Sequence, residues 1–359
     1  QPELHARRGR NNIMRPVHDI GLPLLFAPYV RVAYPAAESL AGALPEPVLQ
    51  AARLTPPLIF RHLISLAMAL LTGLLGVQLF SIFSRIAISE RQAMLWALLL
   101  TLSPPLLSHA FLFFTEIPSA LIVVWLVKVL SDPSASTARP RDERGREPAA
   151  LIGIAIGLLL LVHVRNIALV AVFLVWTIVR FHRLSVSRAS WTTFAVSVAL
   201  MLAARTMVVY IFWGSLFTTP LARPDLSLSI VDAIRETAAR AAGLLISRDY
   251  GLLFFAPIYV LAIAGLWLIR SHPMLAARAI WALLAAYLIT LLVPYSNPYG
   301  VAGGFAPASR MIVPIVPLLA IGVFVGAQHL RTLSRALVVL QIAIDLFVWQ
   351  WPKTLWRGQ

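Results

Sequence analysis

Long apolar stretches separated by short charged segments dominate the chain from residue 63 to residue 351. A helix needs about 20 apolar residues to cross a hydrocarbon core roughly 30 Å thick. Two of the stretches are too long for one helix and carry polar residues near their middle, so each is divided into two short helices. The pattern then predicts ten spans, at about 63–83, 93–110, 116–131, 149–163, 166–180, 192–213, 251–269, 280–294, 311–328 and 336–351.

The two divided stretches share one design, an apolar hairpin with a polar tip. Residues 93–130 are interrupted by Pro104 and Pro105, which disfavour helix, and carry Ser108, His109, Thr115 and Glu116 near the tip. Residues 149–180 carry His163, Arg165 and Asn166 at their centre. Two arms of about 15 residues each reach only some 22 Å, less than the hydrocarbon thickness. We therefore expect each tip to lie in a shallow cavity on one side of the bilayer.

The N-terminal region, residues 1–62, is rich in Arg and Pro. Its apolar patch at 20–33 is short and interrupted by Arg31, so it predicts a segment lying on the membrane surface and not a span. The chain begins at Gln1, and its first 50 residues do not form an apolar signal sequence. We therefore expect an upstream segment to precede this sequence.

Two further regions lie outside the predicted spans. Residues 214–250 predict a loop with an amphipathic helix, because charged residues recur at helical spacing within 229–246, at Asp232, Arg235, Glu236 and Arg240. We interpret them as the solvated face of a surface helix. Residues 352–359 form a tail. The sequence as a whole predicts an all-α, polytopic integral membrane protein with about ten transmembrane helices.

Arginine is distributed unevenly between the connections. The segments 84–92, 131–148, 180–190, 270–279 and 329–335 together hold 13 Arg, whereas the short connections 104–116, 163–166 and 294–310 hold only Arg165 and Arg310. Arg-rich loops are typical of the cytoplasmic side. The rule places residues 1–62, the 214–250 loop and the C-terminus outside.

The composition excludes several classes of protein. With 59% apolar and 13% charged residues among 359, the chain is not a soluble enzyme. Lys and Arg number 30 against 15 Asp and Glu, but they are scattered between apolar runs without a basic face, so nucleic acid is not expected as a partner. Cysteine is absent, which excludes disulfides, thiolate metal sites and Cys nucleophiles. No Walker loop, GxGxxG, HExxH or cytoplasmic Asp-x-Asp pair is found, so a nucleotide-driven reaction is not expected.

The predicted topology brings seven ionisable residues to the outside, at or near span ends: His18, Asp19, Glu116, His163, Arg165, Asp249 and Arg310. Ionisable groups at membrane depth usually face a cavity or the protein interior. Glu116 opens a short helix in FTEIPSA, so it either interacts with the helix dipole or faces a cavity, where it could act on an acceptor hydroxyl or bind a divalent cation. Arg165, in HVRN, either anchors at the interface or clamps a phosphate.

Other polar and small residues keep two interpretations open. Arg205, the most deeply placed charge, suits a structural ion pair or a lipid-phosphate contact equally. The Gly-rich loop from Tyr295 to Arg310 can bring backbone donors to a ligand or be a tight connection, and Arg310 favours the ligand. Asp249 and Tyr250 likewise end an outside segment just before a span. The spacing of Gly153 and Gly157 predicts close helix packing and nothing more.

Five segments in order resemble the GT-C superfamily of membrane glycosyltransferases, with bacterial relatives of the dolichyl-phosphate-mannose protein mannosyltransferases as the most similar group. They are HDIGLPLLFAPY at 18–29, the Pro104–Pro105 hairpin with FTEIPSA, LVHVRN at 161–166, SRDYGLLFFAP at 247–257 and SRMIVPIVPLLA at 309–320. The resemblance covers almost the whole chain and rests on the order of loose motifs. The acidic pair that relatives carry in the first external loop is not in this chain, where Glu3 and Asp19 are substitutes by proximity only.

The resemblance implies an inverting transfer of a sugar from a polyprenyl-phosphate carrier to a lipid, glycan or protein acceptor, at the outer face of a bacterial inner membrane. It assigns a carboxylate, Glu116 or Asp19, as the base. Basic and polar residues would contact the donor, namely His18, His163, Arg165, Asp249, Tyr250 and Arg310. No cofactor is certain, no metal ligand is assigned, and a divalent cation stays open.

Two other functions stay in view. A transporter or flippase of a lipid-linked sugar would use the same Arg residues without breaking a bond. Such proteins have paired broken helices in both halves. Both broken hairpins of this sequence lie in its first half and no matching pair follows residue 200, which favours the enzyme. The third interpretation is a truncated, inactive membrane scaffold.

Overall fold

The computed structural model describes residues 6–16, 19–132, 146–214, 216, 229–270, 276–293 and 306–355. His18, most of the 131–148 segment and most of the Gly-rich loop lie outside the described residues. The described part is helical apart from one small antiparallel hairpin, in which β1 (Ala6–Arg8) pairs with β2 (Met14–Pro16) around the 3₁₀ helix η2 (Arg10–Asn12). The all-helical fold class is therefore confirmed for these residues.

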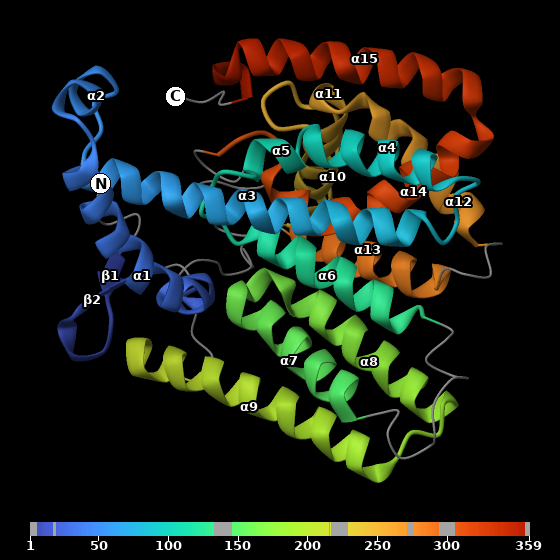
Figure 1. Cartoon of the computed structure of the whole chain (residues 1–359). Helices are drawn as coiled ribbons and strands as arrows, with labels where there is room; N and C mark the ends of the chain where they lie inside the picture. Colours follow the sequence, from blue (N-terminus) through green and yellow to red (C-terminus); the bar gives the residue numbers. More distant parts are fainter. Residues whose placement is uncertain are drawn as a thin grey trace.

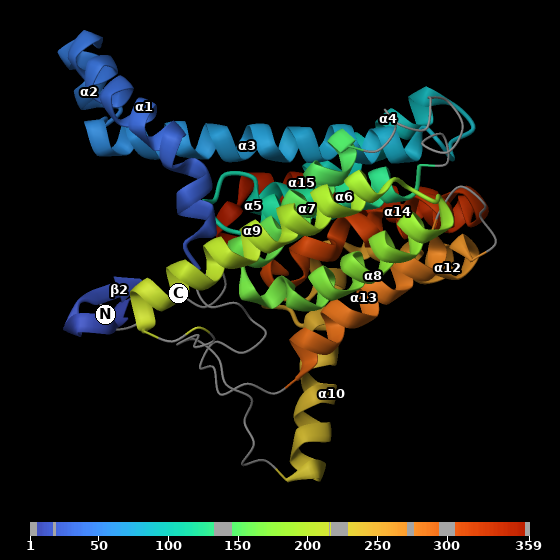
Figure 2. The same ribbon diagram turned by 90° about the horizontal axis from the view of Figure 1, so that it is seen from below.

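The N-terminal helices are α1 (Gly21–Ala43), α2 (Glu46–Ala51) and α3 (Pro56–Phe83). Helix α1 is longer than the 20–33 patch, because it continues through Pro28 and Pro35 into the helix-favouring stretch AAESLAGA. It packs against α3, and the Tyr29 hydroxyl donates to the Leu63 carbonyl at 2.8 Å. Figure 2 shows α1 lying across the N-terminal end of α3 and not along it.

The two apolar hairpins are each divided at their polar tips. The first gives α4 (Glu90–Leu102), the short α5 (Leu106–His109) and α6 (Glu116–Leu130), with a cis bond between Pro104 and Pro105. The second gives α7 (Arg146–Val162), the 3₁₀ helix η4 (Val164–Asn166) and α8 (Ile167–Arg183). Helix α9 (Arg188–Trp213) follows. Each tip thus presents a short irregular segment between two helices.

The second half has breaks that the sequence argument did not anticipate. After α10 (Ile230–Ile246), the expected span at 251–269 is divided into α11 (Leu252–Phe255), η5 (Pro257–Val260) and α12 (Leu261–Ile269). Ala256 departs from helical geometry, with φ −140° and ψ 70°, because it precedes a proline, which disfavours helical geometry at that residue. The sequence prediction, which placed both broken hairpins before residue 200, did not include this break.

The remaining elements complete the bundle (Figure 1). They are α13 (Ala277–Leu292), the 3₁₀ helix η7 (Arg310–Ile315), α14 (Val316–His329), α15 (Arg331–Gln350) and the 3₁₀ helix η8 (Pro352–Leu355). Helix α14 is central, since its residues are almost all buried. The Phe324 ring stacks on the Phe83 ring of α3, with centroids 4.5 Å apart.

Five helical segments of the described chain are long and apolar enough to cross a membrane, at Pro56–Phe83, Val164–Arg183, Arg188–Trp213, Arg310–His329 and Arg331–Gln350. Three of them mainly expose their apolar side chains, for example Leu70 of α3, Met207 of α9 and Val339 of α15. Large exposed apolar surfaces of this kind are not stable in water. They indicate a membrane-embedded protein.

Glycines allow two pairs of helices to approach closely. A Cβ on Gly157 of α7 would lie 2.2 Å from the Met201 Cβ of α9, so the packing role predicted from the Gly153 to Gly157 spacing is confirmed. A second pair was not anticipated. A Cβ on Gly265 of α12 would lie 1.7 Å from the carbonyl oxygen of Gly322 in α14. These contacts hold α7 on α9 and α12 on α14.

The turns of the bundle fall at two opposite ends. Figures 1 and 2 both show the α3–α4, α8–α9 and α14–α15 turns at one end. This end carries the Arg-containing segments 84–92, 180–190 and 329–335, and there Arg180 donates to the Leu130 and Asp132 carbonyls at 2.6 Å, capping the C-terminus of α6. The opposite end carries the tips at Pro105 and His163.

Candidate functional site

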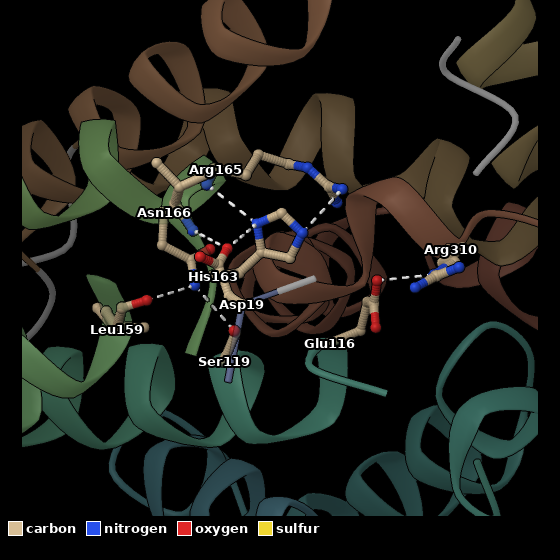
Figure 3. A network of polar contacts seen from close by, with 9 residues as sticks. Asp19, Glu116, Ser119, Leu159, His163, Arg165, Asn166 and Arg310 are labelled. Carbon is tan, nitrogen blue, oxygen red and sulfur yellow. Dashed lines mark hydrogen bonds and ion pairs between the residues drawn. The ribbon is translucent and has the colours of Figure 1, made fainter. Parts of the chain in front are cut away.

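Glu116 and Arg310 form an ion pair at the end of the bundle opposite the Arg-rich turns. Arg310 Nε donates to Glu116 Oε1 at 2.8 Å, and Figure 3 shows the two side chains pointing toward each other. Glu116 opens α6, where the helix dipole also favours a carboxylate. The Arg310 guanidinium lies over the Phe114 ring, 4.0 Å from its centroid. Two expected site residues from distant parts of the sequence are thus in direct contact.

The Glu116 carboxylate is almost completely buried, with 1% of the side chain exposed, whereas Arg310 keeps 22%. Glu116 Oε2 is buried and has no hydrogen-bond partner. Arg165 and His109 also interact with this carboxylate electrostatically. Buried polar atoms are normally satisfied, so an unsatisfied oxygen on a carboxylate that pairs with Arg310 is unusual and marks a functional candidate.

Asp19, His163 and Arg165 form the second half of the site. Asp19 Oδ2 accepts a hydrogen bond from the Val164 backbone N–H at 2.8 Å and lies 3.6 Å from His163 Nδ1. The same nitrogen is 3.1 Å from the Arg165 backbone N–H, and His163 Nε2 is 3.4 Å from the Arg165 guanidinium. Figure 3 shows the Arg165 side chain extending along the His163 ring. The N-terminal segment is therefore tied to the tip of the second hairpin.

Burial raises the pKa of Asp19 above its ordinary value of 3.8, while the Val164 N–H and the nearby Arg205 and Arg165 oppose that change. Arg205 thus interacts electrostatically with an acidic residue, although no partner for it was evident from the residue pattern. Gly21 allows the close approach, because a Cβ there would lie 2.1 Å from the Leu161 carbonyl oxygen. The carboxylate of Asp19 is held against the end of α7.

Asn166 fixes the tip of the second hairpin through hydrogen bonds to α6 and α7. Its side-chain amide donates to the Ser119 hydroxyl of α6 and to the Leu159 carbonyl of α7, both at 2.9 Å, and its side chain is 1% exposed. Because Ser119 is three residues after Glu116, this amide links the helix that carries Glu116 to the tip that carries Arg165. The Asn166 side chain therefore fixes the position of Glu116 on α6 relative to the tip that carries Arg165.

The other expected site residues are placed differently. Asp249 has 52% of its side chain exposed, and its carboxylate lies 3.9 Å from Arg248. The Tyr250 carbonyl accepts a hydrogen bond from the Ser309 N–H at 3.0 Å, which anchors the residue preceding Arg310. The Tyr250 side chain instead packs against Gly243 of α10. Asp249 does not join the site by its side chain, and Tyr250 supports it through the backbone.

Two residues that sequence reasoning did not assign also belong to the site. His109 of α5 is completely buried, and Tyr287 of α13 is as well. Tyr287 donates to the Met311 carbonyl at 2.9 Å and also interacts with the Arg165 guanidinium. His109 was visible as a polar residue at the hairpin tip. Tyr287 gave no signal, because an aromatic residue in an apolar helix is ordinary.

A second polar cluster was also missed. Asp345 of α15 accepts a hydrogen bond from Ser103 at 2.5 Å and another from Gln341 at 2.8 Å, and Gln341 also contacts the Phe255 carbonyl. Ser103 immediately precedes the Pro104–Pro105 turn. An acidic residue within an apolar span was the available signal. The cluster ties α15 to the turn that leads to His109 and Glu116.

This arrangement offers a buried carboxylate at a helix start, hydrogen-bonded to the Arg310 guanidinium and interacting electrostatically with Arg165. Such a set can hold an anionic group and accept a proton from a nucleophile. Among the described residues, no group of three His, Asp or Glu side chains gathers in a way that would hold a metal ion. No family model, curated protein or solved structure matches the chain.

Proposed function

We propose that this protein is a membrane glycosyltransferase that moves a sugar from a polyprenyl-phosphate carrier to a lipid, glycan or protein acceptor. The observation that carries the proposal is the Glu116–Arg310 pair, with Glu116 Oε2 unsatisfied and Arg165 within electrostatic reach. The resemblance of FTEIPSA and LVHVRN to the GT-C superfamily adds the class of reaction.

The Glu116 carboxylate and the arginine guanidinium groups have different roles in the proposed reaction. The acceptor hydroxyl attacks the anomeric carbon, and Glu116 accepts its proton. The bond to the carrier phosphate breaks with its electron pair leaving on the phosphate. Arg310 and Arg165 stabilise that departing anion, because a guanidinium pairs well with phosphate oxygens. A phosphate leaving group needs positive charge more than it needs protonation. His163, which contacts Arg165 and lies near Asp19, orients the guanidinium.

The donor follows from the location of the site. We propose ten spans, in which the shorter helices α4, α6, α7, α12 and α13 cross the bilayer together with the five longer segments. The Arg-rich turns then lie in the cytoplasm, and the site faces the outside of a bacterial inner membrane. A nucleotide sugar is not supplied there, whereas a lipid-linked sugar can reach the site from the bilayer.

The test is a transfer assay with purified protein in liposomes, a labelled polyprenyl-phosphate sugar and a crude membrane fraction as acceptor. We expect the label to move to the acceptor as polyprenyl phosphate is released. In parallel, a fluorescent polyprenyl-phosphate sugar is followed across the liposome bilayer. Movement of the intact lipid without bond cleavage would reject the enzyme and support transport.

Transport is the second candidate, and one observation favours it. The three-helix units α7–α8–α9 and α12–α13–α14 each pack their outer helices closely through glycine, and the central helices α8 and α13 contact each other. Since α7 starts at the Arg-rich end and α12 ends there, the units run in opposite directions (Figure 1). Inverted repeats of this kind are common in transporters. The buried Glu116 with an unsatisfied oxygen favours the enzyme, because phosphate binding alone does not require a carboxylate.

A further inference from the structure

The N-terminal β1–β2 hairpin is docked on the end of α9 that lies opposite the α8–α9 turn (Figures 1 and 2). A Cβ on Gly9 would lie 2.2 Å from the Phe212 carbonyl oxygen, so the absence of a side chain at Gly9 allows this close approach. The Arg15 guanidinium lies over the Phe212 ring, 5.0 Å from its centroid. The Arg10 guanidinium lies over the Tyr210 ring, 4.8 Å from its centroid. The end of α9 therefore holds two arginine side chains of the hairpin in place.

The hairpin carries positive charge that no acidic neighbour in the sequence compensates. Residues 4–17 include four arginines and neither Asp nor Glu. Within the part of the chain that the structure describes, Arg8, Arg10 and Arg15 form no salt bridge. The strand register places the Arg7 position directly opposite Arg15. Like charges at opposite positions destabilise an antiparallel pair, so a bound anion would stabilise the hairpin.

Arg15 also lacks an acceptor for one of its N–H groups. Its Nε is buried and has no hydrogen-bond partner among the described residues. Buried donors normally have an acceptor. The Phe212 ring attracts the cation but supplies no acceptor oxygen. Phosphate oxygens supply one, and their geometry matches the N–H groups of a guanidinium. The hairpin is thus suited to a phosphate group.

Exposed apolar side chains lie beside these arginines. Ile13 and Met14 of the hairpin have 48% and 47% of their surface exposed. The adjoining end of α9 also exposes Met207, Tyr210 and Ile211. Apolar residues next to basic ones are typical of segments at a membrane surface, where the apolar side chains enter the acyl boundary and the basic ones reach the phosphates. The hairpin therefore continues the lipid-facing surface of α9.

We propose that the hairpin and the end of α9 bind the phosphate groups of anionic phospholipids at the bilayer surface, with Ile13 and Met14 inserted at the acyl boundary. A soluble anion would compensate the arginines but would leave both apolar side chains in water. An acidic protein would have to cover a surface that continues along α9 into the bilayer. A phospholipid supplies the phosphate and the apolar phase side by side, so it satisfies both features. The binding is independent of sugar transfer.

The test uses the full chain with one fluorescent label on the hairpin. Because the sequence contains no cysteine, Ile13→Cys accepts a single nitrobenzoxadiazole label. The protein is placed in phosphatidylcholine nanodiscs with or without phosphatidylglycerol of the same acyl chains. Quenching by a phospholipid that carries a spin label on its acyl chain reports insertion of the hairpin. The test variant adds Arg10→Gln and Arg15→Gln. The matched control instead removes the same charge outside the hairpin, through Arg248→Gln and Arg270→Gln.

We expect phosphatidylglycerol to increase the quenching, and the two hairpin substitutions to remove about half or more of that increase, because basic side chains bind an anionic surface. The control should keep the full increase. Equal quenching with and without phosphatidylglycerol, or an unchanged increase in the test variant, would overturn the proposal. A response of the label to inorganic phosphate in nanodiscs without phosphatidylglycerol would assign the arginines to a free anion and would overturn it too.

Thermal unfolding in detergent checks the fold of every variant. If the test variant does not fold, Arg10→Gln alone takes its place, because the Arg10 side chain is exposed. A smaller increase of quenching by phosphatidylglycerol in Arg10→Gln would then support the proposal. An increase equal to that of the control would overturn it.

Discussion

Arg310 and Glu116, 194 positions apart in the sequence, are joined by a hydrogen bond of 2.8 Å at the start of two helices. Arg310 begins η7, which leads into the buried helix α14, and Glu116 begins α6. The pair therefore fixes the central helix of the bundle relative to the first hairpin. It also places a guanidinium beside the only buried carboxylate of the described site that has an unsatisfied oxygen.

Removing Arg310 should destabilise the protein more than removing both charges. In Arg310→Met, the Glu116 carboxylate stays buried without its cation, so we expect a loss of about 3 kcal/mol, the lower end for a buried pair because Arg310 is partly exposed. The double variant Glu116→Gln with Arg310→Met should recover part of that loss. Thermal unfolding in detergent checks both. Additive effects of the two changes would show that the pair is not coupled.

The close contact between α12 and α14 should depend on Gly265. A Cβ at this position would lie 1.7 Å from the Gly322 carbonyl oxygen, which is backbone and cannot rotate away. We expect Gly265→Leu to separate the helices and to lower the midpoint of thermal unfolding strongly, or to prevent folding. The control is Gly73→Ala in α3, where a Cβ meets nothing within 4 Å. That variant should be neutral or more stable by up to about 1 kcal/mol.

Asp19 should make stability depend on pH in a defined direction. Burial raises its pKa in the folded protein above 3.8, so the folded state holds the proton more tightly than the unfolded state does. Stability from this group is present at low pH and is lost as pH rises through the raised pKa. The Asp19→Asn variant cannot ionise, so its stability relative to the wild type should increase over that range. Unfolding midpoints between about pH 4 and pH 7 test this, and an unchanged difference between the two proteins would contradict it.

The absence of cysteine permits a direct test of topology. The proposed topology puts Ser89, at the α3–α4 turn, and Arg248, between α10 and α11, on opposite sides of the membrane, so Ser89→Cys and Arg248→Cys place single thiols on the two sides. A membrane-impermeant maleimide added to intact spheroplasts should label Arg248→Cys and leave Ser89→Cys unlabelled until the membrane is opened. Labelling of both, or of Ser89→Cys alone, would show that the proposed orientation is incorrect.

Much of the architecture follows from hydrophobic pattern and proline alone. The sequence places breaks at Pro104–Pro105 and at 163–166, and the described helices end and begin around both. The full length of α1 could not be predicted, because Pro28 and Pro35 usually interrupt a helix and yet lie inside this one. The break at Ala256 was overlooked, although Pro257 was its signal.

Less of the candidate site than of the fold could be predicted from the sequence. Topology brought Glu116, Arg165 and Arg310 to one end, since this needs only alternation of span direction. It could not pair Glu116 with Arg310 or Asp19 with Val164, because these contacts depend on how the helices pack. His109 Nδ1 lies 2.8 Å from the Pro105 carbonyl oxygen and its Nε2 is buried, and the residue pattern could not show either contact or burial. Asp345 was overlooked, although an acidic residue within an apolar helix is a visible signal in the sequence.

The central claim is that Glu116 acts as the base of sugar transfer, and the Glu116→Gln variant tests it most directly. Glutamine keeps the shape and an acceptor for Arg310, but it cannot take the proton. Glu90→Gln, the same change at the exposed start of α4 at the opposite end, is the matched control. The measurement is the transfer of label from a polyprenyl-phosphate sugar, with donor binding followed on the same samples. We predict a loss of about 10² to 10⁴-fold in Glu116→Gln with donor binding retained and Glu90→Gln unchanged; wild-type transfer by Glu116→Gln would contradict the account.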